Sequence, residues 1–122
     1  MPKVALIEDD PVMLTLLQTL LEYEGFQTLQ INGMGEVNEI LDLLRREKPE
    51  LILLDVHLNQ LNGLDLLHSL RQSEDFSGIR VLVSSGMELS DASALAEADG
   101  FILKPYMPDD LVAKIRRTLA KN

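Results

Sequence analysis

The stretch LILLDVHLN, residues 51–59, decides the fold of this chain. Four apolar residues run directly into Asp55, and a short, unbroken apolar run is typical of a strand that is buried on both faces. Strands of this kind belong to parallel sheets that are covered by helices on both sides. Asp55 is therefore expected at the end of a buried strand, where a carboxylate without a partner is rare.

Strand and helix patterns alternate on both sides of this stretch. Apolar or alternating runs predict strands at residues 4–7, 26–31, 51–54, 81–83 and 101–103. Apolar residues at helical spacing predict helices at residues 11–25, 37–44, 64–70, 92–98 and 109–121. Five strand and helix units in one chain predict an α/β fold, a doubly wound parallel sheet with helices on both faces.

The first predicted helix has clear start and stop signals. Asp10 before Pro11 predicts an N-cap with proline at the first helical position, and Gly25 predicts the end of the helix. A stripe of apolar residues is predicted to face the core, and it contains Met13, Leu16, Leu17 and Leu20. Leu14 lies off that stripe, which predicts either an ordinary, partly buried residue or an exposed contact for a partner.

Composition indicates one globular domain in a reducing compartment. The chain has 122 residues, of which 46 % are hydrophobic and 25 % charged, so we expect residues 1–122 to form a single packed domain. It contains no cysteine, which excludes disulfides and thiolate zinc sites and predicts a cytoplasmic location. No apolar run approaches the roughly 18 residues of a membrane span, and the start does not resemble a signal peptide. A net charge of −9 disfavours direct contact with nucleic acid.

Residues with chemical function follow four of the predicted strands. In a parallel sheet the carboxyl ends of the strands meet at one edge, which is where such folds bind ligands. The side chains that this rule brings together are those of Glu8, Asp9 and Asp10 after the first strand, Asp55 after the third, Ser84 and Ser85 after the fourth, and Lys104 after the fifth. Taken singly, each has an ordinary structural explanation, such as a helix cap, a turn or a surface charge. Together they indicate a functional site.

The chemistry of this set is that of phosphoryl transfer. Carboxylate oxygens from Glu8, Asp9 and Asp55 suit Mg²⁺, which prefers oxygen ligands and is completed by water and phosphate oxygens. A carboxylate beside the ion, here that of Asp55, is a competent phosphoryl acceptor. Lys104 would neutralise charge on the transferred group, and a hydroxyl such as that of Ser84 would donate a hydrogen bond to it.

Four motifs resemble those of a known family. LIEDDP at the first strand, LILLDVHLNQLNG around the third, VLVSSG at the fourth and GFILKPY at the fifth are similar to the receiver domain of two-component response regulators. The motifs occur in the family's order, and the resemblance covers residues 3–119. It implies the chemotaxis-type, flavodoxin-like receiver fold with five helices and the strand order 2-1-3-4-5.

Residue by residue, the resemblance implies roles at the site. Asp55 matches the phosphoacceptor. Glu8 and Asp9 match the acid pair that holds Mg²⁺ together with Asp55, and the backbone carbonyl of His57 matches the remaining protein ligand to the ion. Gly63 matches the glycine of the loop that follows the acceptor.

The resemblance also implies a switch. Ser84 matches the switch serine or threonine that moves toward the phosphate, Lys104 the lysine that pairs with the phosphate, and Phe101 the switch aromatic. The peptide bond between Lys104 and Pro105 is usually cis in the family. Phosphorylation would be read out through the fourth helix, the fifth strand and the fifth helix.

Partners follow from the same resemblance. A sensor histidine kinase or a histidine phosphotransfer domain would donate the phosphoryl group, and it would dock near the first helix. A downstream effector protein or an output domain would receive the signal, and a homodimer that depends on phosphorylation is compatible with the family. Direct contact with nucleic acid or with a membrane is not expected from this domain. The domain would promote only its own phosphorylation and dephosphorylation rather than act as an enzyme on other substrates.

Two other functions fit part of the sequence. One is a small Mg²⁺-dependent phosphohydrolase with Asp55 as the nucleophile, but aspartate phosphatases usually place a second acid two residues later, where this chain has His57. The other is a nucleotide- or flavin-binding module, but no loop reads as a glycine-rich phosphate cradle. Turnover of small phosphomonoesters would separate the first from a switch, and an absorbance scan for a bound cofactor would test the second.

Overall fold

The structure is a computed structural model that describes residues 1–32, 35–58, 61–86 and 96–121. Along the chain these residues form β1 (Lys3–Ile7), α1 (Pro11–Tyr23), β2 (Gln27–Ile31), α2 (Val37–Glu47), β3 (Leu51–Asp55), α3 (Gly63–Arg71), the 3₁₀ helix η1 (Glu74–Phe76), β4 (Arg80–Ser85), β5 (Gly100–Leu103) and α5 (Pro108–Leu119). The strands form one sheet in the order β2-β1-β3-β4-β5, and every neighbouring pair is parallel. The predicted parallel sheet and its strand order are confirmed.

The predicted helices other than the fourth, α1, α2, α3 and α5, form where the sequence places them. The helix predicted at residues 92–98 lies mostly outside the described residues, which leave out residues 87–95. Of its described part, residues 96 and 97 are helical.

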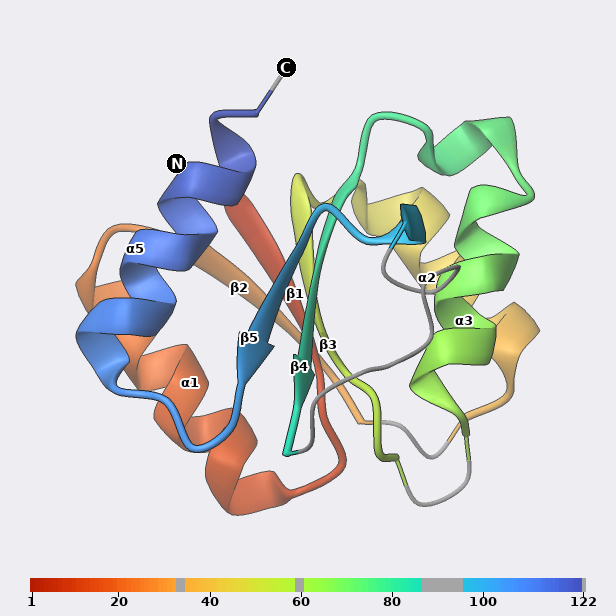
Figure 1. The fold of residues 1–122 in the computed structure, drawn as a ribbon. Helices are drawn as coiled ribbons and strands as arrows, with labels where there is room; N and C mark the ends of the chain where they lie inside the picture. The colour runs from red at the N-terminus through yellow and green to blue at the C-terminus, as the bar shows by residue number, and fades with distance from the viewer. Residues whose placement is uncertain (33–34, 59–60, 87–95, 122) are drawn as a thin grey trace.

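Helices cover the sheet on both faces. In Figure 1, α1 and α5 lie on one side of the sheet, α2 and α3 lie on the other, and the strand arrows point toward the same edge. Each face has its own apolar core: Leu17 and Leu111 belong to the core under α1 and α5, and Leu44 and Leu67 belong to the core under α2 and α3. Because the apolar cores lie between the sheet and the helices, polar side chains can gather in the loops at the strand ends, at one edge of the sheet.

β3 is the centre of the sheet, as its sequence predicts. All 5 of its residues are buried, and it pairs with β1 on one side and with β4 on the other. Ile52 and Leu54 belong to the core under α2 and α3, whereas Leu51 and Leu53 belong to the core under α1 and α5. Both faces of this strand thus need apolar residues until the chain reaches Asp55.

The buried face of α1 differs from the predicted stripe. The buried residues are Leu14, Leu17 and Leu21, whereas Leu16 is 60 % exposed. Two further members of the predicted stripe are partly buried: Met13 and Leu20. The prediction for Leu16 was wrong because α1 is apolar around most of its circumference, so that spacing alone does not select the face that meets the sheet.

One core residue has no counterpart in the prediction. η1 places Phe76 in the core under α2 and α3, with 1 % of its surface exposed. Phe76 is a single aromatic residue in a polar segment without a periodic pattern, so that no helix or strand signal pointed to it.

The N-cap of α1 supports a test of local stability. Asp10 accepts hydrogen bonds from the backbone N–H groups of Val12 and Met13, at 3.0 and 3.4 Å. We expect Asp10→Ala to lower the free energy of unfolding by about 1 kcal/mol, because two N–H groups of the first turn lose their acceptor. Asp10→Asn removes the same charge but keeps the acceptor, so its free energy of unfolding should fall far less. Equal losses in urea denaturation would mean that the charge, not the cap, stabilises the helix.

Candidate functional site

Five predicted site residues meet at the edge of the sheet where the strands end. They are Glu8 and Asp9 after β1, Asp55 at the end of β3, Ser84 near the end of β4 and Lys104 after β5. They come together because the strands are parallel and in register, with Asp55 opposite Ser84. The structure thus brings these side chains to one place, while the roles assigned to them stay predictions.

Lys104 links two acids at this edge. Its Nζ donates to Oδ2 of Asp55 at 3.2 Å and to Oε1 of Glu8 at 3.4 Å. The side chains of Glu8 and Asp55 are only 8 % and 9 % exposed, and that of Lys104 is 25 % exposed. The peptide bond between Lys104 and Pro105 is cis, as the family resemblance implies. One ammonium group therefore lies between two buried carboxyl groups.

Three acids form a group that fits a hard cation. One carboxyl oxygen from each of Glu8, Asp9 and Asp55 lies within 4.8 Å of the other two. Oε2 of Glu8 is buried and accepts no hydrogen bond from the described residues. A buried oxygen without a donor is costly unless a cation or a proton satisfies it. Because oxygen ligands of this kind suit Mg²⁺, the donor set fits the ion that the sequence predicts.

The charges of these groups are coupled. Burial of the Glu8 carboxyl, together with its interaction with the neighbouring Asp55 carboxyl, raises the pKa of Glu8 from 4.5 to about 8. Burial disfavours the Lys104 ammonium, but attraction by Asp55 and Glu8 outweighs burial and raises the pKa of Lys104. Without a cation, Glu8 therefore keeps its proton near neutral pH. A cation among the three acids would compete with that proton.

Backbone contacts fix the orientation of Asp55. Its Oδ1 accepts a hydrogen bond from the N–H of His57 at 3.1 Å, and the N–H of Val56 donates to the carbonyl of Ser84 at 3.0 Å. Ser84 is buried, and His57 is exposed. The metal-binding role predicted for the carbonyl of His57 stays a prediction.

Gly63, the first residue of α3, lies against the backbone at the end of β3. A Cβ atom at this position would be 2.4 Å from the carbonyl oxygen of Asp55 and 2.8 Å from Cα of Val56. The N–H of Gly63 also donates to the carbonyl of Val56 at 3.1 Å. No side chain fits between these groups, which gives a physical reason for the glycine that the resemblance implies.

Tyr106 is a member of the site that sequence reasoning missed. It lines one small cavity together with Glu8, Asp55, Ser84 and Lys104. Burial raises the pKa of its hydroxyl. The available signal was its position two residues after Lys104, in the loop that follows the fifth strand.

Phe101 lies on β5 beside the strand that carries Ser84. It is partly buried, pairs with Val83 of β4 and packs against the core under α2 and α3. Ser84 is the next residue of β4. On the edge of β4 that is away from β5, it pairs with Asp55 of β3. The residues predicted to form the switch thus occupy neighbouring strands in the order β3, β4 and β5.

Comparison with known proteins identifies the family. The family model for the response regulator receiver domain matches residues 4–116. The transcriptional regulatory protein CpxR of Escherichia coli (strain K12) is 34% identical over 123 residues, which cover 100% of this chain and 51% of CpxR. The DNA-binding response regulator MtrA of Mycolicibacterium smegmatis is 32% identical over 123 residues, which cover 98% of this chain and 51% of MtrA. The chain therefore spans about half the length of the curated relatives it matches.

Solved structures agree with this similarity. The BeF3-activated N-terminal receiver domain of RstA from Klebsiella pneumoniae superimposes with a TM-score of 0.83 at 25% identity, over 98% of this chain and 99% of that chain. In the described ranges, no helix is both long enough and apolar enough to cross a membrane. Strand order, family match and related structures agree, and this chain belongs to the response regulator receiver domain family of two-component signalling.

Proposed function

We propose that this receiver domain is a phosphorylation-dependent switch and that Asp55 is its phosphoacceptor. The observation that carries the proposal is the buried Asp55 carboxyl, which lies 3.2 Å from Nζ of Lys104 and within the carboxyl cluster of Glu8 and Asp9. An oxygen of Asp55 would form a bond to phosphorus while the bond from phosphorus to a histidine nitrogen of the donor breaks. That nitrogen keeps the electron pair of the broken bond.

The groups around Asp55 would have separate tasks in this step. Positive charge beside the phosphoryl oxygens would come from Mg²⁺ held by Glu8, Asp9, Asp55 and the backbone carbonyl of His57. Lys104 would exchange its contact with Asp55 for a contact with a phosphoryl oxygen. The hydroxyl of Ser84 would donate a hydrogen bond to another phosphoryl oxygen.

The pH dependence of Mg²⁺ affinity follows from the raised pKa of Glu8. Because its pKa is about 8, the cation must displace a proton at lower pH. We expect the apparent affinity for Mg²⁺ to weaken by about tenfold for each pH unit below that value, and to level off above it. Calorimetric titrations from pH 6 to about pH 9 would measure this. An affinity that is constant over this range would mean that Glu8 is already ionised.

The same proton makes the stability of the metal-free protein depend on pH. The folded chain holds the Glu8 proton at pH values where the unfolded chain has lost it, since the pKa is raised from 4.5 to about 8. Stability without metal should therefore fall as the pH rises through this range. Glu8→Gln removes the titrating group, so this variant is the control in which both pH trends should disappear.

Phosphorylation would bias two arrangements of the same elements. Ser84 lies between Asp55 of β3 and the strand that carries Phe101. Movement of Ser84 toward the phosphate would let Phe101 turn inward, so that the predicted fourth helix, β5 and α5 form the readout surface. Converting a mostly inactive population into a mostly active one takes about 5 kcal/mol, and charge-assisted contacts of Lys104 and Ser84 with the phosphate would supply a large part.

The proposed phosphoryl donor is a sensor histidine kinase or a histidine phosphotransfer domain. Exposed apolar residues on α1 support a docking surface there: Val12 is 67 % and Leu16 is 60 % exposed. Both lie in the first turns of α1, which begins three residues after Glu8. Leu16 therefore takes the place that sequence reasoning considered for Leu14.

The proposed receiver of the signal is an effector protein or an output domain. The match of this chain to about half of CpxR and of MtrA, which are a transcriptional regulatory protein and a DNA-binding response regulator, supports an output domain. The net charge of −9 supports a domain that does not itself contact nucleic acid. We propose that residues 1–122 form one receiver domain with a cytoplasmic location. We also propose that one of its assemblies is a homodimer that depends on phosphorylation.

The domain would promote only its own phosphorylation and dephosphorylation. Intact mass after incubation with Mg²⁺ and acetyl phosphate tests this, and the expected result is a labile gain of one phosphoryl group. We expect no sustained release of phosphate from small phosphomonoesters. Sustained release of phosphate from such substrates would instead support the phosphohydrolase, in which Asp55 is the nucleophile and the phosphorylated protein is only a transient intermediate.

A further inference from the structure

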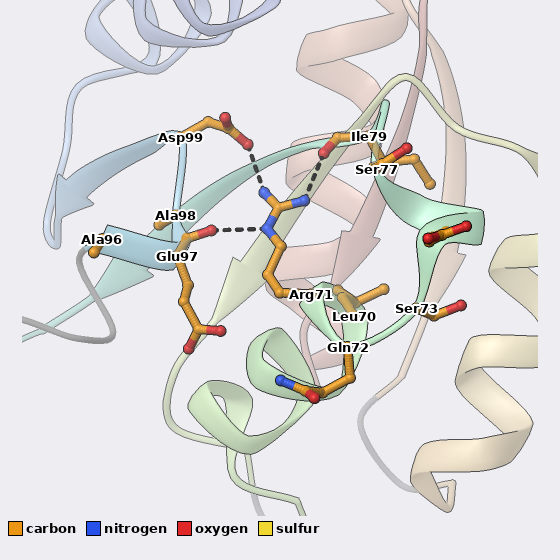
Figure 2. Close-up of a pocket in the computed structure, with 11 residues that line it drawn as sticks. Leu70, Arg71, Gln72, Ser73, Ser77, Ile79, Ala96, Glu97, Ala98 and Asp99 are labelled. Carbon is orange, nitrogen blue, oxygen red and sulfur yellow. Dashed lines mark hydrogen bonds and ion pairs between the residues drawn. The ribbon is translucent and has the colours of Figure 1, made fainter.

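Arg71 joins three separate segments of the chain. It is the last residue of α3, and its guanidinium donates to the carbonyl of Glu97 from Nε at 2.9 Å and to the carbonyl of Ile79 at 3.1 Å. It also forms an ion pair with Oδ2 of Asp99 at 2.7 Å. Figure 2 shows the guanidinium at the centre of these contacts, beside a cavity that the same residues line. Three of its five N–H groups thus have partners, and these partners lie on two segments, one before β4 and one before β5.

Asp99 connects this contact to the sheet. Its Oδ2 accepts the N–H of Val81 at 2.8 Å, and its own N–H donates to the carbonyl of Val81, also at 2.8 Å. Asp99 therefore sets the position at which the chain enters β5 beside β4. Phe101 follows two residues later and pairs with Val83, two residues after Val81. Any shift of Asp99 along β4 would move Phe101 with it.

The ion pair is too well enclosed to be an ordinary surface contact. The side chains of Arg71 and Asp99 are 21 % and 27 % exposed, whereas those of Arg45 and Asp42, an ion pair on α2, are 41 % and 75 % exposed. Loss of the guanidinium would leave a carboxylate and two carbonyl groups without that donor. These groups belong to the segments that Arg71 holds together, so the effect of its loss should be concentrated there.

We propose that Arg71 is a positioning residue for Phe101, which it places through Asp99. α3 is 9 residues long; it begins at Gly63, against the carbonyl of Asp55, and ends at Arg71. One helix therefore connects the end of β3 with the entrance of β5. Its role in the response rests on the proposed phosphorylation of Asp55, because a shift of the loop before α3 would then be transmitted through Arg71 to the strand of Phe101.

Hydrogen exchange at single amides tests the positioning role in the unphosphorylated protein. In Arg71→Gln, we expect the amide protons of Val81 and Asp99 to exchange about tenfold faster or more relative to the wild type, since a charged hydrogen-bond network is lost. Amide protons of β1 should change much less. The chain has 3 phenylalanines, so the ring signals of Phe101 can be assigned by NMR and should shift as well. Acceleration that is equal in β1 and at Val81 would overturn the proposal.

Two further variants separate positioning from general stability. Arg45→Gln removes an arginine that bonds Asp42 and Asp75, away from β5, and should leave Val81 and Asp99 at wild-type protection relative to β1. Arg71→Lys keeps the charge but cannot reach three acceptors in a plane, so it should restore the Asp99 contact in part. If Arg45→Gln shifts the Phe101 ring as strongly as Arg71→Gln does, the effect is global and the proposal fails.

The response to phosphorylation is measured on the same samples. After Mg²⁺ and acetyl phosphate, Arg71→Gln should gain one phosphoryl group as the wild type does, but the accompanying shift of the Phe101 signals should be smaller. An unchanged shift would overturn the coupling role. A wild type that gains no phosphoryl group would overturn the proposed function instead, and the exchange comparison would still decide the positioning role.

Discussion

Asp55→Asn should take up no phosphoryl group from acetyl phosphate in the presence of Mg²⁺, whereas the wild type gains one. The amide has nearly the shape of the carboxyl group, and its single oxygen can still accept one of the two wild-type hydrogen bonds, from the N–H of His57 at 3.1 Å or from Nζ of Lys104 at 3.2 Å. It lacks the anionic oxygen that attacks phosphorus, and the substitution removes one negative charge from the carboxyl cluster that would hold the cation. Intact mass of both proteins, after the same incubation, measures the difference.

The control for this result is the same substitution at an exposed acid. Asp65 lies in the first turn of α3 and is exposed, so Asp65→Asn should gain a phosphoryl group as the wild type does. Circular dichroism would show that both variants are folded. A phosphoryl gain that persists in Asp55→Asn would place the acceptor elsewhere, with Glu8 and Asp9 as the next residues to substitute.

The sheet and the site were predictable because both follow from strand polarity. The five strands could be read from short apolar runs, and parallel strands carry whatever follows them to one edge. Glu8, Asp55 and Lys104 are up to 96 residues apart in sequence, yet each directly follows or ends a strand, so that their meeting needed no knowledge of side-chain packing. Their position at strand ends is what made the site visible.

Features that depend on packing were not predictable. α1 has apolar residues on nearly every side, and only contact with the sheet selects Leu14 over Leu16. Arg71 and Asp99 are 28 residues apart, and no sequence motif or periodic pattern links them, so neither residue stood out in the sequence. Hydrophobic periodicity reports the direction of burial within one element, but it says nothing about which residue of another element lies opposite.

Gly63→Ala should destabilise the protein more than any other single substitution considered for this chain. The added Cβ would lie 2.4 Å from the carbonyl oxygen of Asp55 and 2.8 Å from Cα of Val56, and both are backbone atoms that no rotamer change can move. Either α3 or the end of β3 must shift, at a cost of about 3 kcal/mol in the free energy of unfolding. Urea denaturation would measure this cost, and the fraction of protein that takes up a phosphoryl group should fall as well, because the shift displaces Asp55.

Gly78→Ala is the matched control, since a Cβ atom there meets no atom within 4 Å. Its free energy of unfolding should stay within about 1 kcal/mol of the wild type, as expected for glycine at an open position. If Gly63→Ala unfolds at the wild-type urea concentration, the start of α3 can move without cost, and the close approach to Asp55 does not constrain the site. If it is destabilised but still phosphorylated to the full extent, α3 has moved while Asp55 has stayed in place. Stability and phosphorylation together therefore decide which of the two backbones yields.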